Sequence, residues 1–217
     1  MVVVVGAGPG VGGAVARRFG REGYDVALIG LAGPDLDSLG ESLQADGITT
    51  GWTGADITDP VDLTAAIERL AGHSGRIDVL HFNPSAFRQK NPLTLAPDEL
   101  LDDVALGVGG LLTAVQAARP FMAEGGRITA TGSMAADKPW HEAASLGVQK
   151  AGLRNLVRSI DATLAPEGIR AVSVTVQGAL AYDDASSPFH PSRVAEAIHS
   201  ASRQDPSAWL TEVVHPR

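Results

Sequence analysis

The sequence predicts an α/β fold, in which helices cover both faces of a doubly wound parallel sheet. The opening run Val2–Val5 is continuously β-branched and stops at Gly6, which is typical of a strand buried on both faces. The stretch 11–21 then has its apolar residues on one helical face and its arginines on the other. Strand and helix patterns alternate from there to near the C-terminus, and such alternation implies parallel strands joined by crossover helices.

Each further element follows from its own hydrophobic pattern. Short apolar runs between polar or glycine-containing segments predict strands, whereas longer runs with an apolar face predict helices. We expect a single domain over residues 1–217, because no repeat, linker or second boundary interrupts the pattern. The loop 178–191 is rich in Ser, Asp and Pro and is the candidate lid. The expected strands are 2–5, 25–31, 49–55, 77–82, 127–131, 170–176 and 209–214, and the expected helices are 11–21, 36–45, 60–71, 98–121, 143–164 and 192–202.

Composition narrows the possible functions. The 217 residues carry 17 basic and 25 acidic side chains, a net charge of −8, which argues against a binder of nucleic acids or anionic membranes. The chain has no cysteine, so nothing requires an oxidising compartment, and we expect a cytoplasmic protein. We recognise no signal peptide and no apolar stretch of about 20 residues, so no membrane span is expected. The histidines lack ligand spacing, and no metal site is predicted.

A glycine-rich turn joins the first predicted strand to the first predicted helix. It reads Gly6-Ala-Gly-Pro-Gly10-Val-Gly12, and glycines at this point let the backbone approach a pyrophosphate at the helix N-terminus. The sequence therefore predicts a dinucleotide site where the strand order of the sheet reverses. The alternative is that the glycines only allow the helix to pack tightly on the sheet, without a ligand.

The spacing Gly-x-x-x-Gly-x-Gly resembles the TGxxxGxG signature of the short-chain dehydrogenase/reductase superfamily, a Rossmann-fold family, with Val5 in the threonine position. Asp56-Ile57 resembles the family's pair that contacts the adenine ring. Phe82-Asn83-Pro84-Ser85 stands where the family has NNAG and keeps the second Asn, and Gly178 resembles the Pro-Gly turn beside the nicotinamide. The resemblance implies that the cofactor is NAD or NADP, held by Gly6, Gly10, Val11, Gly12, Asp56, Ile57, Asn83, Lys150 and Gly178.

The choice between NAD and NADP stays open in the sequence. An acidic residue at the end of the second strand would bond the ribose of NAD, whereas a basic residue would pair with the 2′-phosphate of NADP. The strand ends Ile29-Gly30-Leu31, which offers neither charge, and Pro9 occupies a position that is often basic in relatives that prefer NADP. Asp35 and Asp37 are near enough along the chain to reach the ribose, but they also suit an N-terminal cap of the next helix.

The catalytic motif of the family is incomplete in this chain. Reduction of a carbonyl needs a proton donor beside the oxygen, and the family uses Tyr-x-x-x-Lys with a Ser and often an Asn. The resemblance implies Ser133 and Lys150 as catalytic residues, but Leu146 stands in the tyrosine position and Gly107 in the position of the Asn. In the family the lysine also bonds the nicotinamide ribose. The alternatives without a functional role are that Ser133 only caps the next segment and that Lys150 lies on the surface.

Three functions are compatible with the leucine. The protein transfers hydride with water, Ser133 or another side chain as the acid; or it binds a cofactor or metabolite as a silent sensor or scaffold; or it runs non-redox chemistry on the same fold. We favour an NAD(P)-dependent oxidoreductase that acts on a small carbonyl or alcohol. Tyr182 in the loop and His141 before the lysine helix are candidate surrogate acids, whereas Tyr24 lies at the wrong edge of the sheet. If Tyr182 is the acid, Tyr182→Phe abolishes turnover and leaves cofactor affinity unchanged.

The glycines of Gly107-Val-Gly-Gly110 lie inside a predicted helix. Each costs about 1 kcal/mol relative to alanine there, so a close approach or a kink should offset them. In the family this helix and the lysine-bearing helix form the dimer interface, where small residues allow tight packing. We therefore expect a homodimer or homotetramer.

Overall fold

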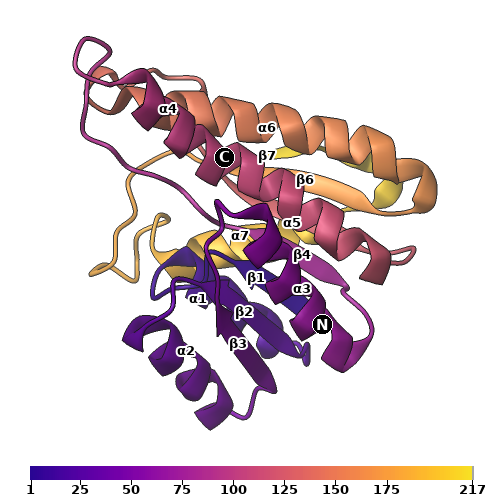
Figure 1. Cartoon of the computed structure of the whole chain (residues 1–217). Helices are drawn as coiled ribbons and strands as arrows, with labels where there is room; N and C mark the ends of the chain where they lie inside the picture. Colours follow the sequence, from indigo (N-terminus) through magenta and orange to yellow (C-terminus); the bar gives the residue numbers. More distant parts are fainter. Residues whose placement is uncertain (217) are drawn as a thin grey trace.

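The computed structural model describes residues 1–216 and contains a seven-stranded sheet whose neighbouring strands all run parallel (Figure 1). The spatial order is β3-β2-β1-β4-β5-β6-β7, so the predicted doubly wound α/β fold is confirmed. Arg217, the last residue of the predicted domain, lies outside the described residues. The strands are β1 Val2–Val5, β2 Val26–Gly30, β3 Thr50–Gly54, β4 Val79–Phe82, β5 Arg127–Ser133, β6 Arg170–Val176 and β7 Glu212–His215.

Helices cover both faces of the sheet because alternate residues of the strands point to opposite sides. Val3 and Val5 of β1 belong to the core beneath α3, α5 and α6, whereas Val2 and Val4 belong to the core beneath α1, α2 and α7. Figure 1 shows α5 and α6 side by side on one of these faces. The helices are α1 Val11–Gly20, α2 Pro34–Ala45, α3 Pro60–Ser74, α4 Pro97–Val104, α5 Gly110–Ala118, α6 Ala144–Leu164 and α7 Pro191–Ser202.

The last strand begins later than the sequence predicts. Its first expected residue, Trp209, instead donates its indole N–H to the carbonyl of Ala171 at 2.9 Å. The guanidinium groups of Arg127 and Arg170 lie 5.3 and 5.0 Å from the centre of its ring. These contacts hold Trp209 beside the sheet rather than in it, so β7 starts at Glu212.

The predicted helix 98–121 is interrupted by a π-helical turn at Ala105–Gly109, which separates α4 from α5. A Cβ on Gly107 would lie 2.7 Å from Oε1 of Gln149 in α6, and one on Gly110 would lie 2.8 Å from Cγ2 of Ile57. The close approach that we expected for these glycines is therefore present. It occurs within the chain, however, so these two residues give no support to a subunit interface.

The helical run Pro97–Phe121 is long and apolar enough to cross a membrane by length and composition, which the sequence analysis did not anticipate. In the fold, Leu111, Ala114 and Ala118 of this run are fully buried in the core that α5 shares with α3. A core helix of an α/β domain needs such an apolar surface. We therefore describe the run as a core helix of the domain.

Candidate cofactor and active site

The glycine loop after β1 is folded tightly against the end of β4. Gly6 has a φ of +81°, in the left-handed region, and a Cβ on it would lie 2.8 Å from Cδ of Pro84. A Cβ on Gly12 would lie 2.5 Å from the carbonyl oxygen of Gly6. No side chain fits at either position, so the first and last glycines of the loop are required by packing.

The N-terminus of α1 has no capping side chain. Gly10 is the N-cap, it supplies no side-chain hydrogen bond, and the first turn contains no acidic residue. A Cβ on Gly8 would meet no atom within 4 Å. The first amides of a helix need acceptors, and the described residues provide none for the amides of Val11 and Gly12, so the loop fits the diphosphate of a dinucleotide.

Asn83, at the end of β4, joins the glycine loop to β5. Its Nδ2 donates to the carbonyl of Gly6 at 3.1 Å, and its Oδ1 accepts from the hydroxyl of Thr131 at 2.8 Å. Both polar atoms of the side chain are therefore used. The sequence analysis did not single out Thr131, and its contact with Asn83 was missed.

Lys150 of α6 points into this cluster. Its side-chain ammonium donates to the carbonyls of Thr131 at 2.9 Å and of Pro84 at 3.2 Å, and the residue is only 3% exposed. Burial lowers the pKa of Lys150 to about 8, because the charged form loses its hydration. The alternative of a surface lysine is therefore wrong.

His81 of β4 is a buried titratable group that the sequence analysis did not connect with the site. Its Nδ1 lies 2.9 Å from Oγ1 of Thr129, and its Nε2 lies 3.4 Å from Oγ1 of Thr131. Burial, together with the charge of Lys150, lowers the pKa of His81 to about 3. The imidazole is thus neutral at physiological pH and belongs to the same polar cluster as Thr131.

Ser133 is the last residue of β5. Its Oγ accepts a hydrogen bond from the amide of Ala135 at 3.2 Å and caps the 3-10 turn Met134–Ala136, so the capping alternative is present in the structure. Among the hydrogen bonds of residues 1–216, none uses the Ser133 hydroxyl as donor. Its proton is free for an acceptor such as a substrate oxygen.

The first turns of α6 lack the expected proton donor. Leu146 is half-buried there, and the preceding Ser145 has a buried hydroxyl without a hydrogen-bond partner in the described part of the chain. Gln149, fully buried, accepts from the amide of Ala86 at 3.1 Å and donates to its carbonyl at 2.8 Å. Its side chain fills the space beside Gly107, where the family has an Asn.

Asp56, Ile57 and Gly178 have local partners of their own. The carboxylate of Asp56 accepts from the amide and hydroxyl of Thr58 at 2.8 and 2.6 Å, and these bonds lower its pKa. Ile57 is buried beside Gly110, and a Cβ on Gly178 would lie 2.6 Å from the ring of Phe189. Their predicted contacts with the cofactor stay predictions.

Charged side chains of both signs line the groove near the ribose end, Asp35 together with Arg17 and Arg21, so the charges there do not decide the cofactor. Gly33 is the N-cap of α2 and no side chain caps that helix, so the capping role suggested for Asp35 and Asp37 is wrong. Asp37 instead accepts from the indole of Trp52 at 2.9 Å. Asp35 is exposed and lines a groove of about 880 Å³ between α1, α2 and α7, which also reaches Pro9.

The candidate surrogate acids lie in different places. The hydroxyl of Tyr182 would be 3.1 Å from a Cβ on Gly10, so this side chain covers the glycine loop. His141 is exposed in the 3-10 turn before α6. Tyr24 packs edge-on against Phe19, with ring centres 5.5 Å apart, in the core beneath α1.

A parallel sheet with an open, glycine-rich loop at the point where its strand order reverses defines a dinucleotide-binding domain of the Rossmann type. Comparison with known proteins identifies the family. A short-chain dehydrogenase family model, described as Enoyl-(Acyl carrier protein) reductase, matches residues 6–213. The chain belongs to the short-chain dehydrogenase/reductase superfamily, as its motifs predicted.

Curated relatives are named as oxidoreductases. Oxidoreductase UcpA of Escherichia coli K12 is 30% identical over 218 residues, which cover 97% of this chain and 77% of the relative. Cis-4-hydroxycyclohexanecarboxylate dehydrogenase of Sinomonas cyclohexanicum is 32% identical over 178 residues, which cover 80% of this chain and 71% of the relative.

Solved structures agree with the fold. A short-chain dehydrogenase from Burkholderia cenocepacia in complex with NADP is 26% identical, with a TM-score of 0.89 over 99% of this chain and 95% of that one. A metagenomic short-chain oxidoreductase in complex with NADP is 23% identical, with a TM-score of 0.86 over 99% and 96%. The second likeness concerns the fold alone.

Proposed function

We propose that this protein binds NAD(H) or NADP(H) along the carboxyl edge of β1 and β4 and transfers hydride between the nicotinamide and a small carbonyl or alcohol. The observation that carries the proposal is the hydrogen-bonded chain from Lys150 through Thr131 and Asn83 to the carbonyl of Gly6. A buried ammonium without a carboxylate partner is costly, and a lysine with no role has no reason to stay there.

Different residues around the glycine loop would bind different parts of the cofactor. Amides of the segment from Gly6 to Gly12, with Gly10 and Val11 at the start of α1, would hold the diphosphate. Asp56 and Ile57, which follow β3, would contact the adenine, and Asn83, Lys150 and Gly178 would lie beside the nicotinamide and its ribose. When bound, the nicotinamide supplies or accepts the hydride.

Ser133 would donate its free hydroxyl proton as a hydrogen bond to the substrate oxygen and so orient the carbonyl. Reduction puts a hydride on the carbon and a proton on the oxygen, and Leu146 has no proton to give. We infer that solvent water supplies it. Loss of a positioned acid typically costs about 10²- to 10⁴-fold in rate, so slow turnover is expected.

The relatives favour an oxidoreductase over a silent binding protein. The two curated relatives described above are named as an oxidoreductase and a dehydrogenase, and the solved relative from Burkholderia cenocepacia holds NADP. The preference between NAD and NADP stays open, because β2 ends at Gly30 and no charged residue follows directly.

Titration of the purified protein with NADH and with NADPH, followed by nucleotide fluorescence, tests the proposal. We expect saturable binding of at least one of them, and oxidation of the bound nucleotide when an aldehyde is added. The protein should show a cooperative thermal transition in the same buffer, which confirms that it is folded. If neither nucleotide binds at millimolar concentration, the proposed function is wrong and only the fold stands.

We further propose a homodimer, or a homotetramer built from it, formed through the outer face of α5 and α6. Leu112 is exposed there beside a groove of about 420 Å³ between the two helices. The groove is lined mainly by apolar residues, and a second copy would remove its exposed Leu112 and half-buried Leu156 from water. Light scattering after size exclusion should give twice or four times the monomer mass, and Leu112→Asp should give monomers.

We also propose that the protein works in the cytoplasm. The sequence contains no cysteine that an oxidising compartment would convert to disulfides. Fractionation of cells that express the protein would test this, and recovery outside the cytoplasmic fraction would contradict it.

A further inference from the structure

Phe87 and Trp140 form an exposed aromatic pair. Their ring centres are 5.5 Å apart with the planes tilted by 49°, yet Phe87 is 60% exposed and Trp140 is 46% exposed. A pair that only stabilised the fold would be buried. Large aromatic surfaces that stay in water beside each other are typical of places where a ligand packs.

The loop that carries Phe87 is held rigidly on both sides of it. Ala86 is fixed by two hydrogen bonds to Gln149. Arg88 donates two hydrogen bonds to the buried carboxylate of Asp103, at 3.0 and 3.2 Å. Because the anchors lie immediately before and after Phe87, the exposed ring is held in a defined place rather than on a free loop.

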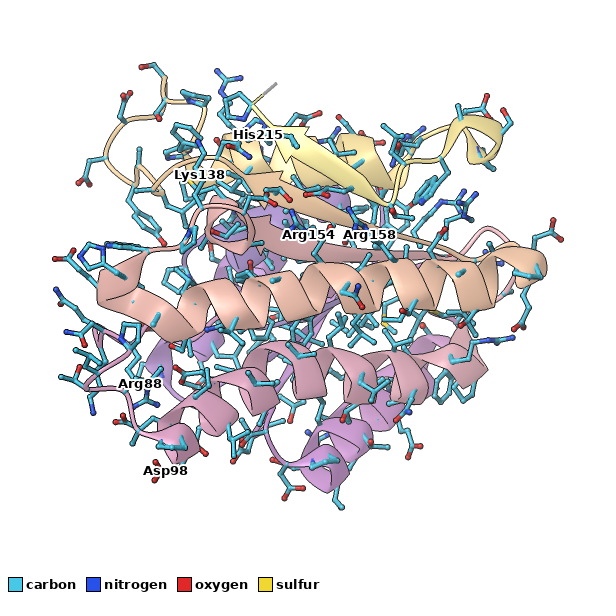
Figure 2. All side chains as sticks on the ribbon, turned by 90° about the horizontal axis from the view of Figure 1, so that it is seen from above. Arg88, Asp98, Lys138, Arg154, Arg158 and His215 are labelled. Carbon is cyan, nitrogen blue, oxygen red and sulfur yellow. The ribbon has the colours of Figure 1, made fainter. Side chains whose placement is uncertain are left out.

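The loop that carries Trp140 is joined to the first one. The amide of Ala144, at the start of α6, donates to the carbonyl of Lys90 at 3.1 Å. The amide of Ala143 donates to the carbonyl of Trp140 at 3.0 Å. Figure 2 shows Arg88 and Lys138, which lie on the two loops, at the same end of α6 and on either side of it. The two loops therefore present their aromatic rings together.

This end of α6 is also the end where Ser133 and Leu146 lie. A Cβ on Gly147 would be 2.9 Å from the carbonyl oxygen of Ala135, so the first turn of α6 packs against the segment that follows Ser133. Trp140 lies in the connection between that segment and α6, and Phe87 follows the end of β4. Leu146, half-buried in the first turn of α6, adds a further apolar group.

We propose that the substrate carries an apolar ring, alicyclic or aromatic, that packs against Phe87 and Trp140 while its carbonyl or hydroxyl group is held by Ser133. This inference rests on the proposed function. The occupant is a substrate rather than a second copy of the chain, because the pair stands at the carboxyl edge of the sheet, where ligands of this fold bind, and not on the face of α5 and α6. Offset or edge-on contact with aromatic rings favours a flat or cyclic body over a short linear one.

The test compares an aldehyde that carries a ring with one that does not. Reduction of benzaldehyde and of propanal is measured in wild type, Phe87→Ala and Trp140→Ala, with NADPH or NADH, whichever binds. We expect kcat/KM for benzaldehyde relative to propanal to fall roughly tenfold in each variant. Leu210→Ala is the matched control, because Leu210 is 51% exposed before β7, at the opposite edge of the sheet, and its ratio should not change.

A binding measurement keeps the inference falsifiable if wild-type turnover is too slow to measure. Saturation-transfer NMR with the nucleotide-loaded protein should show contact with the ring of benzaldehyde in wild type, and a weaker signal in both alanine variants. An unchanged ratio and an unchanged NMR signal would overturn this inference alone if the nucleotide still binds. Failure of the nucleotide to bind would overturn the proposed function instead. A change of oligomeric state in Phe87→Ala would assign the pair to a subunit contact and also overturn the inference.

Discussion

The glycine loop and the first turns of α6 lie at the same edge of the sheet but use their polar groups differently. Around the loop, both side-chain polar atoms of Asn83 are bonded, and the ammonium of Lys150 is held by two carbonyls. In α6, Leu146 has no polar group and the buried hydroxyl of Ser145 has no partner among the described residues. The contrast teaches that this chain keeps the polar groups that would hold a cofactor and lacks the side chain that would deliver a proton.

Leu146→Tyr should have the largest effect, because it would give the first turn of α6 the polar group that it lacks. A phenol one helical turn before Lys150 would restore a proton donor, so reduction of an aldehyde should accelerate by about 100-fold or more. Steady-state kinetics with saturating nucleotide would measure the gain. Leu146→Phe is the control, since it adds the ring without the hydroxyl. Equal rates in the two variants would mean that the missing acid is not what limits turnover.

Gly12→Ala should weaken nucleotide binding at the glycine loop. The new Cβ would meet the carbonyl oxygen of Gly6 at 2.5 Å, and a backbone atom cannot move aside without displacing the loop. We expect Kd for the nucleotide to rise by about 100-fold or more. Gly72→Ala in α3, which has no neighbour within 4 Å, should leave Kd unchanged and raise stability by about 1 kcal/mol. Normal affinity in Gly12→Ala would show that the loop does not need its tight fold.

The burial of Lys150 predicts that the free energy of unfolding rises at alkaline pH. Its pKa falls from 10.5 to about 8 on folding, so the unfolded chain binds more protons between these values and stability rises with pH there. Below about pH 8 the lysine is charged in both states and the penalty of burying the charge is fully present. Relative to Lys150→Met, wild type should gain about 2 kcal/mol in unfolding free energy between pH 7 and pH 9.5. Urea titrations at both pH values would measure it; a constant difference would contradict the burial.

Tyr182→Phe should have the smallest effect and would decide the role of this side chain. Because the hydroxyl lies over Gly10, we expect it to assist the nucleotide, and its loss should raise Kd about fivefold, the value of one neutral hydrogen bond. Tyr24→Phe, in the core beneath α1, is the matched control. The competing result, lost turnover with unchanged Kd, would instead make Tyr182 the surrogate acid.

The fold and the glycine loop were predictable because their signals are local. A β-branched run, a glycine turn and an amphipathic helix stand next to one another in the chain, and the predicted family was confirmed. The partners of Lys150 were not predictable, since Thr131 meets Asn83 only where β5 lies beside β4. A usable signal existed: His81 and Thr129 are polar residues within otherwise apolar strands, and such residues need partners on a neighbouring strand.

The π-helical turn was missed for a related reason. The glycines of 107–110 indicated a cost in helix stability. Nothing in the sequence indicated that Gln149, far along the chain, fills the space beside Gly107. The sequence analysis attributed the small residues to a second subunit. The structure explains Gly107 and Gly110 by contacts inside one chain.

The fit between Gly107 and Gln149 couples these two positions in any attempt to restore the asparagine of the family. Introduced alone at 107, the larger residue would collide with an amide oxygen 2.7 Å from its Cβ. Shortening the glutamine first would release Ala86 and, with it, the neighbouring Phe87. Neither single substitution is neutral. An asparagine at position 107 therefore requires a simultaneous change of Gln149.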